Sequence, residues 1–272
     1  MRFFMNYPGN KTKALTLSYD DGVIQDKRFI EIIDKYGLKA TFNINSGLFS
    51  ENDVSEKGRM SLNQCIELYA DSNHEVATHG HTHMAYDMAP ISVTAYEIMK
   101  DREELERIFK KMVRGGAYPY GTYNDESIDA LKSAGVVYCR TTKATHSCSI
   151  PKNWLKLHPT CHHNDEKLFE LTENFVKSNP YYPQLLYVWG HTYEFDNDNN
   201  WDRIEKFCEI AGKKDDIWYC TNMEVYEYVD AYKSLIFSAD SKTIYNPTLK
   251  KLWFKCNDKS YSIESGETIV LK

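Results

Sequence analysis

The sequence predicts an α/β protein whose strands form a barrel or distorted barrel, followed by a small β-rich appendage at the C-terminal end. Short apolar strands alternate with amphipathic helices about seven times over roughly 220 residues, an order typical of a parallel sheet. Polar residues able to do chemistry follow several of these strands directly. After about Tyr232 the helical spacing gives way to short apolar runs separated by polar turns.

The first half of the alternation rests on apolar runs of four or five residues for strands and on apolar residues three or four apart for helices. Gly37 is a stop signal for the first helix. The predicted elements are, in order, a strand at 15–19, a helix over Phe29, Ile32, Ile33 and Tyr36, a strand at 40–44, a helix over Leu62, Cys65, Ile66 and Tyr69, a strand at 75–78, and a long charged helix with Ile98, Leu105, Ile108, Phe109 and Met112 facing inward.

The second half repeats the pattern, with Asn124 as an N-cap. Its predicted elements are a strand near Ala117, a helix after Asn124, a strand at 136–140, a helix over Leu168, Leu171 and Phe175, a strand at 185–189, a helix over Ile204, Phe207 and Cys208, a strand at 217–220 and a helix after Asn222. The domain prediction is a barrel over 1–232 and a β-rich appendage over 233–272. Its apolar runs are 235–237, 243–245, 252–254 and 268–270.

Charge and composition exclude some classes of partner. The 33 Lys and Arg residues against 39 Asp and Glu give a formal net charge of −6, and no basic block is present that would neutralise a run of phosphates. Nucleic acid is therefore not an expected partner. Aromatic residues make up 14% of the chain, and Tyr and Trp faces suit sugar rings, although most of these residues are expected in the core.

No apolar segment has the length of a signal-peptide core or a membrane span. The seven cysteines are odd in number, and several fall on apolar faces, so they are expected to be reduced core thiols. Together these features predict a cytoplasmic protein. The run Cys161-His162-His163 is not expected to be a second metal site, because it lacks a paired Cys-x-x-Cys.

The candidate site follows from what comes after each strand. Asp20 and Asp21, His79, the segment 118–121 and His191 each lie directly after a predicted strand. In a parallel barrel those positions share one rim, where active sites are built. These residues, distant in sequence, are therefore expected to converge.

Two histidines and a carboxylate suggest a catalytic metal site. If the segment turned helically, His79 and His83 would share a face and both reach one ion, with Asp21 supplying an oxygen. This donor set leaves positions open for water and substrate. The ion would activate water, and Asp20, held off the metal, would accept a proton. The alternative is that the aspartates are turn or capping residues and the histidines a polar surface cluster.

These residues also carry a family resemblance. Over roughly residues 12–230 the chain resembles the polysaccharide deacetylases of carbohydrate esterase family 4, through Asp20-Asp21-Gly22, His79-x-x-x-His83 and Tyr118-Pro119-Tyr120-Gly121. The resemblance implies a distorted (β/α)7-type barrel and a divalent ion, commonly zinc, held by Asp21, His79 and His83. It also implies that Asp20 is the general base, that His191 is the general acid, and that a backbone N–H near Tyr120 holds the oxyanion, with Tyr118 and Pro119 in the same substrate-facing motif.

The chain departs from the family pattern in the third and fourth motifs. Ala117 stands where the family usually has the arginine that orients the catalytic aspartate, and Arg114 is a speculative substitute. The aspartate that tunes the acid histidine is not evident: Asn153 is the nearest candidate, and Glu194 is an alternative. In the second motif Gly80 replaces the usual Ser or Thr.

The expected function is removal of acetyl groups from an N-acetylated carbohydrate by a metal-dependent hydrolase. Two alternatives stay open: hydrolysis of a small amide or ureide, and a weakly active, metal-containing carbohydrate-binding protein. Two imidazoles and a carboxylate also accept cobalt, nickel, iron or manganese. The substrate and the oligomeric state are not determined by the sequence.

Overall fold

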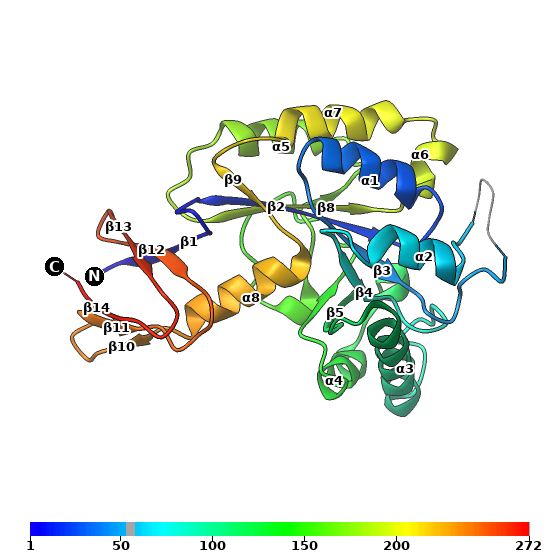
Figure 1. The fold of residues 1–272 in the computed structure, drawn as a ribbon, viewed down its shortest axis with the longest axis horizontal. Helices are drawn as coiled ribbons and strands as arrows, with labels where there is room; N and C mark the ends of the chain where they lie inside the picture. Colours follow the sequence, from blue (N-terminus) through cyan, green and yellow to red (C-terminus); the bar gives the residue numbers. More distant parts are fainter. Residues whose placement is uncertain (53–57, 272) are drawn as a thin grey trace.

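The computed structural model describes residues 1–52 and 58–271 and has a curled, mostly parallel sheet at its centre (Figure 1). Its strands run in the order β6-β5-β4-β3-β2-β8-β7, and β9 pairs with the first residues of β2. These strands are β2 (Lys13–Asp20), β3 (Ala40–Ile44), β4 (Glu75–Thr78), β5 (Gly115–Ala117), β6 (Tyr138–Arg140), β7 (Cys161–His162), β8 (Gln184–Gly190) and β9 (Ile217–Tyr219). The predicted distorted (β/α)7-type barrel is confirmed.

Residues 157–162 bring the two edges of the sheet together. Leu157 forms a parallel bridge with Arg140 at the end of β6, and a few residues later Cys161 and His162 form β7 and pair with β8. The same short stretch of chain therefore contacts both edges. This closure places the end of β6 across the barrel from the end of β2, which matters for the site.

Helices cover the outside of the sheet, with α1, α5 and α7 along one side and α3 beside α4 on another (Figure 1). Their amphipathic faces supply the core, and the ring of Phe29 lies 4.0 Å from that of Tyr19 on β2. The helices are α1 (Asp26–Lys35), α2 (Leu62–Tyr69), α3 (Ile91–Phe109), α4 (Asp125–Ser133), α5 (Leu168–Lys177), α6 (Tyr193–Asn197), α7 (Trp201–Ala211) and α8 (Asn222–Lys233), with 3₁₀ turns at Pro119–Gly121 (η1) and Trp154–Lys156 (η2).

Local sequence signals placed most of these boundaries. Asn124 caps α4 through a hydrogen bond from the backbone N–H of Ser127, as its position predicts. One detail of the α3 prediction is wrong: Lys110 takes a left-handed conformation and ends the helix, so Met112 lies beyond it and is 81% exposed. The strand β7 and the short helix α6 were not predicted.

The C-terminal region is β-rich, as predicted, but it is completed by a strand from the other end of the chain. β1 (Phe3–Asn6) pairs antiparallel with β12 (Leu252–Cys256), which pairs with β13 (Lys259–Ile263). A second small sheet holds β10 (Ile236–Phe237), β11 (Thr243–Tyr245) and β14 (Thr268–Val270). The division into 1–232 and 233–272 stays a prediction, and residue 272 lies outside the described residues.

Candidate metal centre and active site

The candidate residues gather at the rim formed by the carboxyl ends of the parallel strands. The strand register aligns Asp20 with Asn43, Ile44 with Thr78, and Ala117 with Arg140. Several residues in the loops that follow adopt positive φ, namely Asp21 at 85°, His83 at 58° and Tyr120 at 60°. Left-handed backbone in residues other than glycine is uncommon and clusters at functional sites.

Asp21, His79 and His83 converge on one point. The Nε2 atoms of His79 and His83 are 3.2 Å apart, and His83 Nε2 lies 3.7 Å from Asp21 Oδ1. One ligand atom from each of the three residues lies within 4.8 Å of the other two. The segment does not turn helically, because Gly80 and His83 both take positive φ, and the two imidazoles meet without sharing a helical face.

The chemistry of this donor set fits a divalent metal ion. A hydrogen bond between His79 Nδ1 and the carbonyl oxygen of Ala117, 2.9 Å long, turns Nε2 toward the centre of the group. Burial, reinforced by the nearby His79, lowers the pKa of His83 to about 4, so its imidazole is neutral and can offer a lone pair. Two imidazoles and one carboxylate are the ligands expected of a catalytic metal site with open positions.

Arg59 and Asn45 fix the loop that carries Asp21 against the loop that carries His79. Arg59 donates to Asp21 Oδ1 over 2.9 Å, to the Asp21 carbonyl over 2.8 Å and to Asn45 Oδ1 over 2.6 Å. Asn45 in turn donates to the carbonyls of His79 and Gly80. Sequence reasoning did not identify either residue.

Asp101 on α3 holds the start of the loop that carries His79. Its buried carboxylate accepts hydrogen bonds from the Thr78 hydroxyl and from the backbone N–H groups of His79 and Ser46. This residue was also missed, although the pattern contained a signal. Asp101 stands between Ile98 and Leu105 on the inward face of α3, where a charged residue needs a buried partner.

Asp20 lies beside the metal group and is held by two donors. Asn43 donates to Oδ1 over 2.8 Å, and the guanidinium of Arg140 donates to Oδ2. The side chain of Asp20 is only 3% exposed. Burial by itself would raise the pKa of Asp20, but the charges of Arg140, His79 and His191 lower it to about 2. Asp20 is therefore a carboxylate at neutral pH.

Arg140 occupies the position beside Asp20 that Ala117 leaves open. Its side chain is 1% exposed, and its guanidinium carbon lies 4.2 Å from the centre of the Trp189 ring. Arg114, the substitute considered from the sequence, precedes β5 and so lies at its opposite end, beside Tyr226 and Glu227. Arg140 is the last residue of the predicted strand 136–140, one position before the place where the other candidate residues follow their strands, and that signal could have found it.

His191 faces Asp20 on one side and Glu194 on the other. Its Nε2 lies 3.8 Å from Asp20 Oδ2, and its Nδ1 lies 3.3 Å from Glu194 Oε1. Burial by itself would lower the pKa of His191, but contact with Glu194 and the charge of Asp20 outweigh it and raise the pKa above the ordinary value. Asn153 instead caps the turn η2, so Glu194 is the acidic neighbour of His191.

In the segment Tyr118-Pro119-Tyr120, the first two residues are buried in the core and only Tyr120 is exposed at the rim. Tyr118 is buried, donates to the Leu155 carbonyl over 2.8 Å and packs on Tyr123, so its side chain is not brought to the site. Pro119 is buried as well. The Tyr120 ring is 67% exposed and lies 4.6 Å from the His83 ring, which places it beside the metal group.

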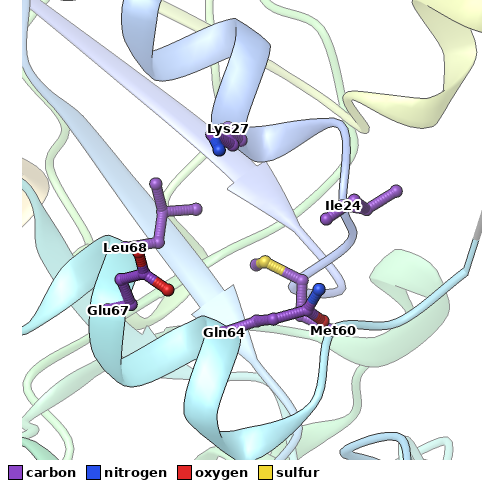
Figure 2. Close-up of a pocket in the computed structure, with 6 residues that line it drawn as sticks. All are labelled: Ile24, Lys27, Met60, Gln64, Glu67 and Leu68. Atoms are coloured by element: carbon purple, nitrogen blue, oxygen red, sulfur yellow. The ribbon is translucent and has the colours of Figure 1, made fainter. Parts of the chain in front are cut away.

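A separate hollow of about 220 Å³ lies between α1 and α2 (Figure 2). The residues that line it are Ile24, Lys27, Met60, Gln64, Glu67 and Leu68, and none of them is a candidate site residue. The position of this hollow therefore gives no reason to move the site away from the rim.

Two wider properties bear on the expectations from the sequence. The seven cysteines are all free thiols in the structure, and six of them are buried. Within the described residues, no helix has the length and apolar character needed to cross a membrane.

Comparison with known proteins agrees with this fold. A family model for polysaccharide deacetylase matches residues 8–139, a stretch that contains Asp20, Asp21, His79 and His83 and ends one residue before Arg140. A poly-β-1,6-N-acetyl-D-glucosamine N-deacetylase of Staphylococcus aureus is 27% identical over an alignment of 140 residues that covers 46% of this chain and 47% of that protein. The chain thus matches about half the length of this curated relative.

Two solved structures share the fold. A candidate polysaccharide deacetylase from Mycobacterium smegmatis superposes with a TM-score of 0.60 at 16% identity, covering 84% of this chain and 93% of the other. A carbohydrate esterase family 4 pseudoenzyme from Bacillus anthracis gives a TM-score of 0.53 at 18% identity, covering 82% and 68%. The family match over residues 8–139, the matching motifs and the barrel together support placing the chain among the polysaccharide deacetylases of carbohydrate esterase family 4.

Proposed function

We propose that this protein is a metal-dependent hydrolase that removes acetyl groups from an N-acetylated carbohydrate. One observation carries the proposal. The carboxylate oxygen Oδ2 of Asp20 lies 3.8 Å from Nε2 of His79, in the metal group, and 3.8 Å from Nε2 of His191. The proposed base, the proposed acid and the candidate metal ligands therefore lie close together, an arrangement that supports hydrolysis of an amide.

Asp21, His79 and His83 would hold the ion. Zinc is our first choice, and cobalt, nickel, iron or manganese suit the same ligands. When bound, the ion supplies a Lewis acid that polarises the acetyl carbonyl and lowers the pKa of water. The protein fixes the ligands in advance through Ala117 and Arg59.

Asp20 is proposed as the general base. Its low pKa keeps it ionised, and Arg140 and Asn43 occupy its two oxygens so that the carboxylate cannot rotate freely. The carboxylate would accept a proton from the attacking water. Because Arg140 supplies the positive charge that Ala117 cannot, the departure in the third motif does not leave Asp20 unsupported.

His191 is proposed as the general acid. An amide nitrogen leaves only when it is protonated, so an acid must stand on the side of the leaving amine. The raised pKa of His191 favours its imidazolium form, and Glu194 at Nδ1 keeps Nε2 turned toward Asp20 and the reaction centre. His191 would then release its Nε2 proton to the amine as the bond breaks.

The substrate side of the rim includes Tyr120. Its exposed ring could lie against a sugar face, and the backbone N–H near it is the proposed oxyanion donor. N-acetylated carbohydrate is supported as the substrate class by the Staphylococcus aureus relative, whose name specifies a poly-β-1,6-N-acetyl-D-glucosamine N-deacetylase.

The direct test is acetate release from N-acetylglucosamine oligomers by protein loaded with Zn or Co. Both β-1,6- and β-1,4-linked oligomers should be tried, together with a small ureide for the alternative reaction. We expect release by the wild type, and loss of it in Asp20→Asn. Asp125→Asn, which changes an almost fully exposed aspartate on α4, is the matched control and should keep the wild-type rate.

The outcomes separate the hypotheses. Equal and negligible acetate release by the wild type and Asp20→Asn on every oligomer would contradict the proposed activity. Turnover of the ureide alone would favour the small-amide alternative. Oligomer binding without any turnover would favour a carbohydrate-binding protein.

A further inference from the structure

The histidines beside Glu194 form a second group with the chemistry of a metal site. His162 Nε2 and His163 Nε2 each lie 3.1 Å from Glu194 Oε2, while His191 Nδ1 lies 3.3 Å from Glu194 Oε1. The sequence of the run 161–163 does not predict a metal site, because it lacks a paired Cys-x-x-Cys. The ligand set that the structure assembles does not need one, because its other members come from the loop after β8.

We propose that His162, His191 and Glu194 form a second divalent metal site, and that its occupation inhibits the enzyme. The three residues each offer one ligand atom, and all three atoms lie within 4.8 Å of one another. They repeat the donor types of the first group, two imidazoles and a carboxylate. Zinc is the reference ion for this set.

The spacing suits a small ion. Ligands about 2.0–2.1 Å from a tetrahedral zinc ion lie roughly 3.3–3.4 Å from one another. Glu194 Oε2 lies 3.1 Å from His162 Nε2, and Glu194 Oε1 lies 3.3 Å from His191 Nδ1, so each carboxylate oxygen is already close to that separation from one imidazole nitrogen. Nδ1 of His191 is buried and makes no hydrogen bond of normal geometry with the described residues. Coordination at this atom requires loss of the Nδ1 proton, as metal binding to a histidine nitrogen does.

The three proposed ligand residues are partly exposed to solvent, whereas His163, which contacts Glu194, is buried. The side chains of His162, His191 and Glu194 are 23%, 22% and 25% exposed, whereas His163 is fully buried between Tyr19 and Phe195. The His163 ring stacks on both of these rings, and its Nε2 lies 3.1 Å from Glu194 Oε2, so this contact holds the Glu194 carboxylate in place. An ion can thus reach preplaced ligands.

Inhibition follows from the two faces of His191. Its Nε2 faces Asp20 and the reaction centre, and its Nδ1 faces the second site. An ion on Nδ1 takes the place of the Nδ1 proton, which passes to solvent. His191 then cannot form the imidazolium that gives up its Nε2 proton. This consequence rests on the proposed function, whereas the binding of the ion does not.

The experiment counts ions. Metal-free protein is titrated with Zn²⁺ by calorimetry, and the bound zinc is measured after dialysis. We expect two ions in the wild type, one in His162→Ala, one in His83→Ala and none in the double variant. His146→Ala removes a partly exposed histidine paired with Asp165 elsewhere and serves as the control, with two ions expected.

Acetate release is measured over the same zinc range, each variant relative to its own highest rate. The wild type and His146→Ala should lose activity when zinc exceeds one equivalent, and His162→Ala should need at least tenfold more zinc for the same loss. A single ion, lost in His83→Ala and kept in His162→Ala, would overturn the second site. A single ion that is lost in His162→Ala and kept in His83→Ala would uphold the second site. That result would refute the metal group of Asp21, His79 and His83 in the proposed function.

Discussion

Replacing Arg140 with methionine tests whether this residue positions the catalytic base. Arg140 and Asp20 have side chains that are 1% and 3% exposed, so the substitution leaves a buried carboxylate without its charged partner. Removing one partner of a buried pair costs about 3–5 kcal/mol of unfolding free energy. A neighbouring arginine lowers the pKa of an aspartate by about 1–3 units, so its loss should raise the pKa of Asp20 by a similar amount.

The catalytic effect has a definite sign. Asp20 works as a base only when ionised, so the acidic limb of the pH dependence of kcat/KM should move upward by about 1–3 pH units in Arg140→Met. Misplacement of the carboxylate should also lower kcat by roughly 100-fold at neutral pH. Arg140→Lys keeps the positive charge but lacks the planar guanidinium that holds the carboxylate in one orientation. It should therefore return the acidic limb of kcat/KM close to its wild-type pH, while kcat stays lower than in the wild type.

The assay is acetate release across pH, with unfolding by denaturant measured in parallel. Arg114→Gln is the matched control, because it removes an arginine from the opposite end of β5. It should change neither the acidic limb nor kcat. A folded Arg140→Met protein with the wild-type rate and an unmoved acidic limb would refute the assignment of Arg140 as the positioning residue.

Three further predictions follow from other contacts. A chelator should abolish acetate release and lower the melting temperature. Zinc added back at 100 times its dissociation constant should restore about 2.7 kcal/mol of unfolding free energy. An unchanged melting temperature after chelation would argue against a resident ion. Gly190→Ala should cost about 1–3 kcal/mol in thermal unfolding, because the new Cβ would lie 2.0 Å from Nδ1 of His163; wild-type stability would contradict this packing. Burial raises the pKa of Asp26 to about 7 although Thr192 and Tyr69 donate to it, so the folded state holds this proton more tightly than the unfolded chain. Stability from Asp26 is thus fully present below its ordinary pKa and is lost as pH rises to 7, by at most about 1.4 kcal/mol per pH unit. Denaturation of the wild type and Asp26→Asn at pH 4.5 and 7 should show this loss in the wild type alone; an equal difference at both values would contradict it.

Patterns among residues that are close in sequence predicted most of the strands and helices. Periodicity found the strand at 40–44 with the bounds that the structure gives and located the polar residues after strands, because both signals depend on neighbours close in sequence. It did not find β7, whose two residues are too short for any period to show. It also did not show that the N-terminal strand β1 completes the C-terminal sheet, since that pairing spans about 250 residues.

The sequence by itself therefore indicated most of the order of strands and helices, the family resemblance, and the metal-ligand, base and acid candidates. Tertiary structure decided which of those residues meet. Arg140 reaches Asp20 only because residues 157–162 close the barrel between β6 and β8, and Glu194 lies among three histidines only because β7 pairs with β8. The physical reason is that a charge pair depends on distance in space, and strand pairing sets that distance between residues far apart in the chain.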